Sequence, residues 1–285
     1  MIIEHANGIT NKRLTFKKLL LILALIILIY HSTLYWLYQR YTASDTYYSY
    51  GYFVPLISLY LIWLKKKELT IDHKFNFLGL TIIILALTIH SFSILAGVFF
   101  LSGFSLLLLM IGIALFLLGR STIKKIIFPL TFLVFMFPLP LVMLNSISYF
   151  LRIFLTKSTV FVLKTVMHLS ISNERFQIVF PRGILTIDDS CSGLHSLIVI
   201  LTFTSVFAYL LKANRTKKIA LFLLAAPIAI ISNFIRILLL SFGSYLFGSN
   251  TIKGFFHELT GYLTFAIAIT ALWLFWKTFQ CKNPI

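Results

Sequence analysis

The chain reads TIIILALTIHSFSILAGVFFLSGFSLLLLMIGIALFLLG over residues 81–119, without a single Asp, Glu, Lys or Arg. An α-helix needs roughly 20 mostly apolar residues to cross a bilayer, so this stretch is long enough for two membrane helices. A weakly marked turn divides it, and the pattern predicts helices over 77–96 and 98–118. The stretch therefore assigns the chain to a membrane rather than to water.

The same apolar character extends over the whole chain of 285 residues, which is 59% hydrophobic and only 12% charged. Soluble domains are about half apolar and about a quarter charged. The composition therefore predicts an all-α polytopic membrane protein of about eight transmembrane helices, forming a single integral membrane domain over 1–285. The predicted helices cover residues 18–38, 51–64, 77–96, 98–118, 126–146, 191–211, 219–241 and 257–276.

The basic residues predict the orientation of the chain. A net charge of +17 fits nucleic acid as a partner, but the Lys and Arg residues lie in short clusters between apolar stretches. Cytoplasmic loops of membrane proteins are enriched in Lys and Arg. We therefore expect a lipid bilayer and no nucleic acid as partner, with a cytoplasmic N-tail 1–17 and a cytoplasmic C-tail 277–285. The regions 1–18, 65–74, 119–125, 212–218 and 277–285 hold 17 of the 25 Lys and Arg residues.

One outer segment, residues 147–190, is long enough for structure of its own. Its first part carries basic residues among Phe, Leu and Val, which predicts a short amphipathic helix in the outer interface. Residues 176–180 and 184–187 then flank Pro181-Arg182-Gly183, a pattern typical of a hairpin. The hairpin leads directly into the sixth predicted helix.

Three residues with unusual chemistry fall at the outer ends of the last three predicted helices. Cys191 opens the sixth, His257 opens the eighth, and Arg236 lies about five residues before the seventh ends at 241. At 1.5 Å per residue, Arg236 would lie roughly 8 Å below that end. Each has an ordinary explanation, as a buried thiol, a snorkelling guanidinium or an interfacial ring. A shared layer instead favours a site, because an intramembrane Arg tends to face a polar partner.

A thiol at this position suits nucleophilic chemistry. Its reactive form is the thiolate, which a helix N-terminus or a neighbouring cation stabilises. His257 is able to move a proton to a leaving amine, and Arg236 is able to support either the thiolate or an oxyanion. Both roles of Arg236 stay open at this point. Asn233 lies one turn before Arg236 on the same helical face, which favours a polar lining.

Several short motifs in order resemble the exosortase/archaeosortase family. Near the C-terminus these are Cys-Ser-Gly-Leu at 191–194, Asn-x-x-Arg at 233–236 and His-x-x-x-Gly at 257–261. Upstream, Tyr-Ser-Tyr-Gly at 48–51 and Phe-Met-Phe-Pro-Leu-Pro at 135–140 are similar to further family patterns. The likeness spans roughly residues 45–265.

The resemblance implies a membrane cysteine peptidase or transpeptidase of the bacterial inner membrane, with its active site facing the periplasm. Its partners would be membrane-anchored proteins with a C-terminal sorting signal, such as the PEP-CTERM tail of motif, helix and basic cluster. Cys191, Arg236 and His257 would form the catalytic triad, and no metal or cofactor is expected. The expected substrate-binding residues are Asn233, His195, Asp188, Gly193, Tyr48 and Gly51.

Two positions depart from the family pattern. His195 stands where the family commonly has Arg, and Tyr50 stands where it has His. These differences leave the triad intact but bear on the substrate motif. For Asp188 and Asp189, capping and solvation of a helix start compete with a role in the site.

Two other functions remain open from the residues alone. One is a transporter or scaffold that binds a ligand without covalent chemistry, in which the thiol of Cys191 is replaceable. The other is an acyl or glycan-chain transferase that uses Cys191 on a lipid-linked substrate. The second cysteine, Cys281, falls in the cytoplasmic tail and is expected to be inert.

Overall fold

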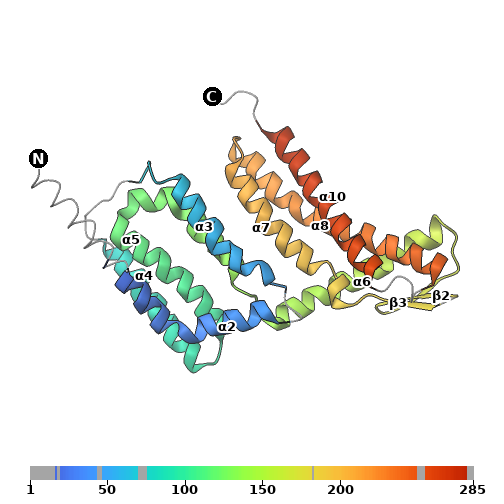
Figure 1. Cartoon of the computed structure of the whole chain (residues 1–285), viewed down its shortest axis with the longest axis horizontal. Helices are drawn as coiled ribbons and strands as arrows, with labels where there is room; N and C mark the ends of the chain where they lie inside the picture. The colour runs from blue at the N-terminus through green and yellow to red at the C-terminus, as the bar shows by residue number, and fades with distance from the viewer. Residues whose placement is uncertain are drawn as a thin grey trace, which may run out of the picture. The chain divides into compact units, whose positions relative to one another are not determined.

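The computed structural model describes residue 17 and residues 20–43, 47–69, 76–181, 183–248 and 254–280 (Figure 1). The chain divides into two compact units, Met1–Pro138 and Leu139–Ile285. Six helices in the described residues are long and apolar enough to cross a membrane, or seven if one bent pair counts as a span. The predicted all-α polytopic class is confirmed at this level, whereas the count of about eight stays a prediction.

The first predicted span is bent in the structure. The helix Leu20–Ile29 meets α2 (His31–Thr42) at an angle of 73°. At the bend, the Ile29 carbonyl lies 3.1 Å from His90 Nε2, and the ring of Tyr30 packs 4.0 Å from the His90 ring. These contacts from α4 stabilise the bend, which the apolar pattern of 18–38 does not reveal.

The remaining helices of the first unit follow the predicted segments closely. The 3₁₀ turn η1 (Ser49–Tyr52) leads into α3 (Phe53–Leu64), and α4 spans Phe77–Leu95. The helix α5 (Phe99–Phe132) is interrupted at Gly119, whose φ of 79° and ψ of 172° are not helical. The ribbon bends sharply there (Figure 1). Gly119 therefore marks the end of the predicted helix 98–118.

The fifth predicted helix, 126–146, has the wrong boundaries. The helix gives way to the 3₁₀ turn η2 (Leu133–Met136), and a new helix, α6 (Leu141–Thr165), starts after Pro140. The break follows from Pro138 and Pro140, since proline lacks the N–H of a helical bond and disfavours helix before it. As a result α6 has 25 residues and is not the short helix that was expected within 147–190.

A small sheet follows α6 in the second unit. The strands β1 (Ser172–Glu174), β2 (Gln177–Phe180) and β3 (Gly183–Thr186) are antiparallel in the order β1-β2-β3. The predicted hairpin is confirmed as β2 and β3, paired with Ile178 opposite Leu185. The strand β1 was not predicted. Apolar side chains of the sheet pack with α6 and α8 in one cluster that includes Leu155, Leu163, Ile178, Phe180, Ile187 and Ile237.

Three long helices complete the second unit: α7 (Leu194–Leu210), α8 (Arg215–Phe247) and α10 (Phe255–Phe279). The helix α8 packs against both α7 and α10. It runs past the predicted end at 241, because Phe242–Phe247 continue the apolar face until Gly248 ends the helix with a φ of 86°. Arg236 therefore lies about three turns from the helix end, deeper than predicted.

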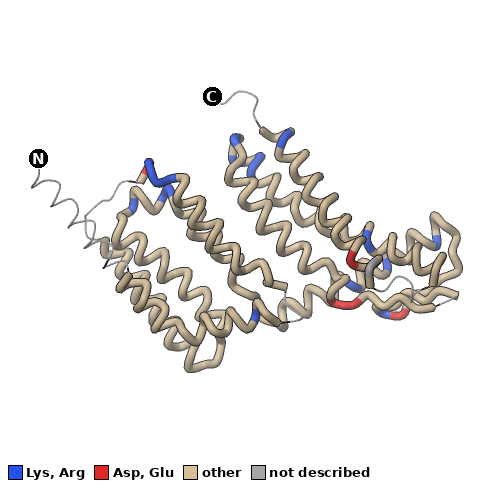
Figure 2. The backbone as a smooth tube through the Cα atoms, in the orientation of Figure 1, with Lys and Arg blue, Asp and Glu red and all other residues tan. Residues whose placement is uncertain are grey.

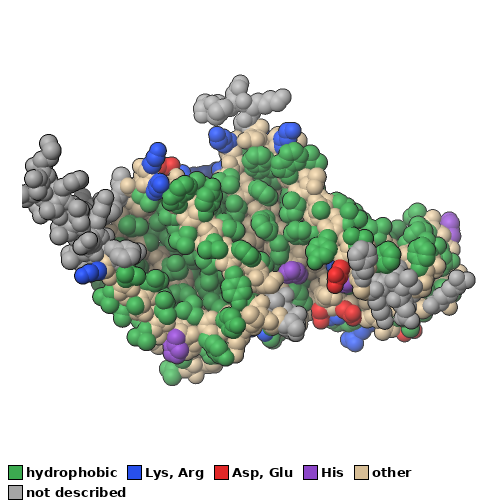
Figure 3. Space-filling view, in the orientation of Figure 1, with side chains coloured by type: hydrophobic (Ala, Val, Ile, Leu, Met, Phe, Trp, Pro, Cys, Tyr) green, Lys and Arg blue, Asp and Glu red, His purple; other side chains and the backbone are tan. Residues whose placement is uncertain are grey.

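One end of the second unit carries basic turns. The α7–α8 turn and the C-terminal end of α10 carry Lys and Arg and lie at one end, opposite η3 (Asp189–Cys191) and the strands (Figures 1 and 2). Between these ends the outer surface is apolar, with exposed residues such as Leu223 and Tyr262 (Figure 3). A large exposed apolar surface of this kind suits contact with lipid.

Candidate active site

Cys191 lies in a turn before α7 rather than in its first helical residue. The 3₁₀ turn η3 contains it, and Gly193 then adopts the left-handed conformation (φ 79°) before Leu194 starts the helix. The expectation that Cys191 opens the sixth helix is therefore corrected: Ser192 and Gly193 lie between it and the helix, and Gly193 has a left-handed backbone. The thiol is almost buried, with 6% of the residue exposed.

Side chains of α6 hold the turn η3 in place. Ser148 donates to Asp189 Oδ1 at 2.7 Å, and Arg152 Nη2 lies 3.2 Å from the same oxygen. Arg152 also stacks 4.2 Å over the ring of Phe176. Sequence analysis did not single out Ser148 or Arg152, because their partner Asp189 is far away along the chain.

The three predicted catalytic residues come together. Cys191 Sγ lies 2.8 Å from His257 Nε2, and Arg236 Nη2 lies 3.3 Å from the same nitrogen. Arg236 Nη2 also donates to the His257 carbonyl at 3.2 Å. The thiol, the imidazole and the guanidinium thus form one contact group contributed by η3, α8 and α10.

The contact with Arg236 defines the state of the imidazole. A guanidinium has only donors, so His257 Nε2 accepts from it and carries a lone pair. The ring is then neutral with its proton on Nδ1, and the Cys191 thiol is able to donate to the same lone pair. This is the arrangement of a base poised beside a nucleophile.

Asn233 positions the cysteine backbone. Its Nδ2 donates to the Cys191 carbonyl at 2.9 Å, and the Asn233 side chain is buried. A Cβ on Gly193 would lie only 2.6 Å from Asn233 Nδ2. A side chain at 193 is therefore excluded both by this contact and by the positive φ.

Gly261 also belongs to the site. It ends the His-x-x-x-Gly motif, but the sequence did not predict a functional role for it. A Cβ at this position would lie 3.2 Å from Arg236 Nη2 and 3.3 Å from Arg236 Cζ. The glycine thus leaves room for the guanidinium to reach His257 one turn earlier on α10. The His-x-x-x-Gly spacing has this physical reason.

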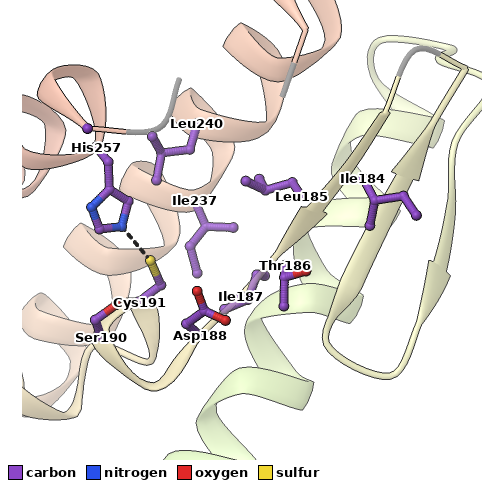
Figure 4. Close-up of a pocket in the computed structure, with 11 residues that line it drawn as sticks. Ile184, Leu185, Thr186, Ile187, Asp188, Ser190, Cys191, Ile237, Leu240 and His257 are labelled. Atoms are coloured by element: carbon purple, nitrogen blue, oxygen red, sulfur yellow. Dashed lines mark hydrogen bonds between the residues drawn. The ribbon is translucent and has the colours of Figure 1, made fainter. Parts of the chain in front are cut away.

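A cavity of about 410 Å³ opens beside the thiol (Figure 4). Cys191 and His257 form one end, and the dashed contact in the figure joins them. The strand β3 and the helix α8 contribute apolar walls. The described residues that line it are Ile184, Leu185, Thr186, Ile187, Asp188, Ser190, Cys191, Ile237, Leu240, Gly254 and His257. The volume lies in the range of ligand cavities.

The other predicted substrate-binding residues have different surroundings. Asp188 is exposed and lines the cavity. His195 is exposed on α7 and is not among the residues that line the cavity. Asn233 donates to the Cys191 carbonyl, and Gly193 follows the Cys191 turn and packs against the Asn233 side chain.

Tyr48 and Gly51 belong to the first unit, where both are buried. There Tyr50 of one upstream motif donates to the Phe135 carbonyl of the other at 3.2 Å, and Tyr41, which precedes the first motif, donates to the Met136 carbonyl at 2.6 Å. A Cβ on Gly51 would lie 2.5 Å from the Tyr41 ring. A direct role of Tyr48 and Gly51 in substrate binding stays a prediction.

Among the described residues, no three His, Cys, Asp or Glu side chains gather as a metal site does. The comparisons with known proteins point to one family. A family model described as transmembrane exosortase matches residues 36–274. No curated protein and no solved structure matches the chain.

Proposed function

Because the chain belongs to the transmembrane exosortase family, we propose that it is a membrane cysteine peptidase or transpeptidase. Its substrates are membrane-anchored proteins, from which it cleaves a C-terminal sorting signal. The observation that carries the proposal is the 2.8 Å contact between Cys191 Sγ and His257 Nε2, with Arg236 on the same nitrogen. A nucleophile, a base and an orienting group within reach of one another are what acyl transfer requires.

The reaction begins when the Cys191 thiol passes its proton to His257 Nε2 and the sulfur attacks the scissile carbonyl. The tetrahedral intermediate collapses as His257 returns that proton to the leaving amine, which departs with the C-terminal segment. The upstream part of the substrate remains on Cys191 as a thioester. Water or an acceptor amine then attacks the thioester and regenerates the thiol.

Arg236 supports this chemistry from beside the cavity rather than from its wall, because it is not among the residues that line the cavity. Its contact with Nε2 favours a neutral ring with a lone pair on that nitrogen, and when the lone pair takes the thiol proton the guanidinium keeps its hydrogen bond to the His257 carbonyl. Its charge also stabilises the thiolate and the oxyanion as they form. Asn233 and Gly193 keep the Cys191 turn in place, and Asp188 meets substrate at the border of the cavity.

The proposed setting is the bacterial inner membrane, with both termini in the cytoplasm and the site at the periplasmic side. The basic turn between α7 and α8 supports this orientation, since it lies at the end of the second unit opposite η3. Lys and Arg favour the cytoplasmic side of membrane proteins.

The Cys191→Ala variant tests the proposal. The loss of one thiol leaves only a small void, so the variant protein should still insert into the membrane. Its substrate, a protein encoded by a neighbouring gene with a sorting motif, one C-terminal helix and a basic tail, should accumulate uncleaved. Immunoblotting of membranes measures the cleavage. The control is Cys281→Ala, at a position outside the described residues, which should process normally.

A trapping experiment identifies the intermediate. Wild-type enzyme quenched in acid with substrate should carry the upstream fragment on Cys191, released by hydroxylamine and detected by intact mass. Cleavage at the wild-type rate by Cys191→Ala would refute the proposal. Partial function of Cys191→Ser without a trapped thioester would instead favour non-covalent binding.

A further inference from the structure

The strand β3 has one free edge. The sheet has the order β1-β2-β3, so β3 pairs with β2 on one side and has no strand on its other side among the described residues. A free edge presents unpaired N–H and C=O groups that are able to pair with another extended chain.

The free edge of β3 faces the cavity beside Cys191. Four consecutive residues, 184–187, line that cavity. Side chains of a strand alternate between two faces, so a cavity that covered one face would meet only every second residue. Contact with all four means that the cavity runs along the edge of the strand, where the backbone is accessible (Figure 4).

The register shows which backbone groups point into the cavity. Ile187 N donates to the Phe176 carbonyl at 2.8 Å, so this pair is a hydrogen-bonded one. Bonded and non-bonded pairs alternate along an antiparallel ladder. Leu185, opposite Ile178, therefore bonds toward β2, whereas Ile184 and Thr186 direct their N–H and C=O groups away from it.

The other wall of the cavity comes from α8, through Ile237 and Leu240, and the Cys191–His257 pair lies at one end. We propose that the segment of substrate upstream of the scissile bond binds as an added β-strand on the free edge of β3. Its main chain pairs with Ile184 and Thr186, and its scissile carbonyl reaches Cys191 Sγ. This mode of binding rests on the function proposed above and specifies how the substrate is held.

The occupant is an extended peptide because of the chemistry of the two walls. An edge offers donors and acceptors at the two-residue repeat of a peptide in β conformation. Apolar residues of β3 and α8 would accommodate its side chains. Main-chain pairing gives affinity that depends little on sequence, so the discrimination between substrates would come from the pocket side chains and from Asp188.

The test uses a probe of defined structure, acetyl-tetraalanine carrying a C-terminal vinyl sulfone, to which the Cys191 thiol adds across the double bond. Full-length protein without Cys281 (Cys281→Ala) is labelled in detergent, and intact mass gives the rate. Methyl vinyl sulfone, which lacks the peptide, reports the intrinsic reactivity of the thiol. The rate advantage of the peptide is the ratio of its labelling rate to that of methyl vinyl sulfone. We expect this ratio to be higher on the protein than on free cysteine.

Thr186→Pro removes one donor from the free edge while keeping the bonds to β2, and proline is tolerated on edges. We expect it to lose about five- to tenfold of the peptide's rate advantage, as for one lost hydrogen bond. The rate with methyl vinyl sulfone should stay unchanged, which shows that the site is folded. Asn173→Pro, in the exposed strand β1 at the opposite edge of the sheet, is the matched control and should keep the advantage.

Peptides methylated at single amide nitrogens supply the second arm. Methylation should slow labelling at alternate positions only, because every second amide of an added strand faces β3. Equal slowing at all positions, no advantage of the peptide in the Cys281→Ala protein, or an unaffected Thr186→Pro would overturn the proposal. Labelling that follows this pattern in a protein whose Cys191→Ala variant still cleaves substrate would instead overturn the function and leave the strand addition standing.

Discussion

Arg236 and the thiol meet on a single atom, His257 Nε2, and this geometry depends on the shape of the guanidinium. One nitrogen, Nη2, contacts both Nε2 and the His257 carbonyl, at 3.3 and 3.2 Å. The rigid planar group is held between α8 and Gly261. A lysine ammonium carries the same charge but is a compact point charge on a flexible stem.

We therefore expect Arg236→Lys to lose most of the activity of the wild type, by about 10²–10³ in rate, as for the loss of one oxyanion-type donor. Single-turnover cleavage in membranes measures this. Arg215→Lys, at the exposed start of α8, is the matched control and should cleave normally. Near-normal cleavage by Arg236→Lys would mean that only the charge matters.

Gly193 is the residue at which backbone conformation and packing limit the site together. Gly193→Ala introduces a Cβ at a φ of 79° and 2.6 Å from Asn233 Nδ2. A displacement of the Cys191 turn by about 1 Å costs on the order of 10²-fold in rate, which is the loss we expect in the cleavage assay.

The control for Gly193→Ala is Gly248→Ala. Gly248 also has a positive φ, of 86°, but nothing lies within 4 Å of its added Cβ. This variant also places a side chain at a positive φ, with a ψ of 150° in place of 0°, but without a contact to a described residue, and it should retain cleavage. If both variants lose activity alike, general destabilisation rather than the contact with Asn233 explains the effect.

At the scale of elements, α6 supports the nucleophile. It contacts η3 through Ser148 and Arg152, both bound to Asp189 Oδ1. The proline break before Leu141 is what allows α6 to start as a separate helix and reach this position. The motif around Pro138 and Pro140 thus has an identifiable structural role.

Arg152→Met should keep the apolar stem but remove the bond to Asp189, and we expect a loss of about tenfold in cleavage because Ser148 still holds the carboxylate. The double variant Ser148→Ala/Arg152→Met should lose more. Lys157→Met, at an exposed position of the same helix, is the control. Full activity of the double variant would show that η3 holds its shape without α6.

For the molecule as a whole, the basic turns between helices predict the sidedness of the membrane protein. In each unit the Lys and Arg residues of the turns between helices gather mainly at one end (Figure 2). Because such clusters stay in the cytoplasm, the turn between α7 and α8 should be internal.

Single cysteines introduced into a protein with Cys191→Ala and Cys281→Ala test this topology. In intact cells, an impermeant maleimide should label positions 45 and 250 but not position 215, which becomes reactive only after lysis. Labelling of position 215 in intact cells would reverse the orientation and place the thiol in the cytoplasm.

Local pattern in the sequence was enough to predict the membrane class, most helix positions, the hairpin and the three candidate residues Cys191, Arg236 and His257. These features follow from local pattern: apolar length, alternation in strands, and rare polar residues at helix ends. Local pattern also misled at several places, among them the helix end at 241, the span 126–146 and the helix start at Cys191. An apolar run does not mark where a proline or a left-handed glycine ends a helix inside it.

How the three residues meet, and what surrounds them, depends on the packing of the folded chain. The support from Ser148 and Arg152, the space left by Gly261 and the open edge of β3 all join segments distant in sequence. Their physical basis is contact between packed elements, which depends on helix rotation and on strand register. A single sequence carries no direct record of either, so these parts of the site appear only once the chain is folded.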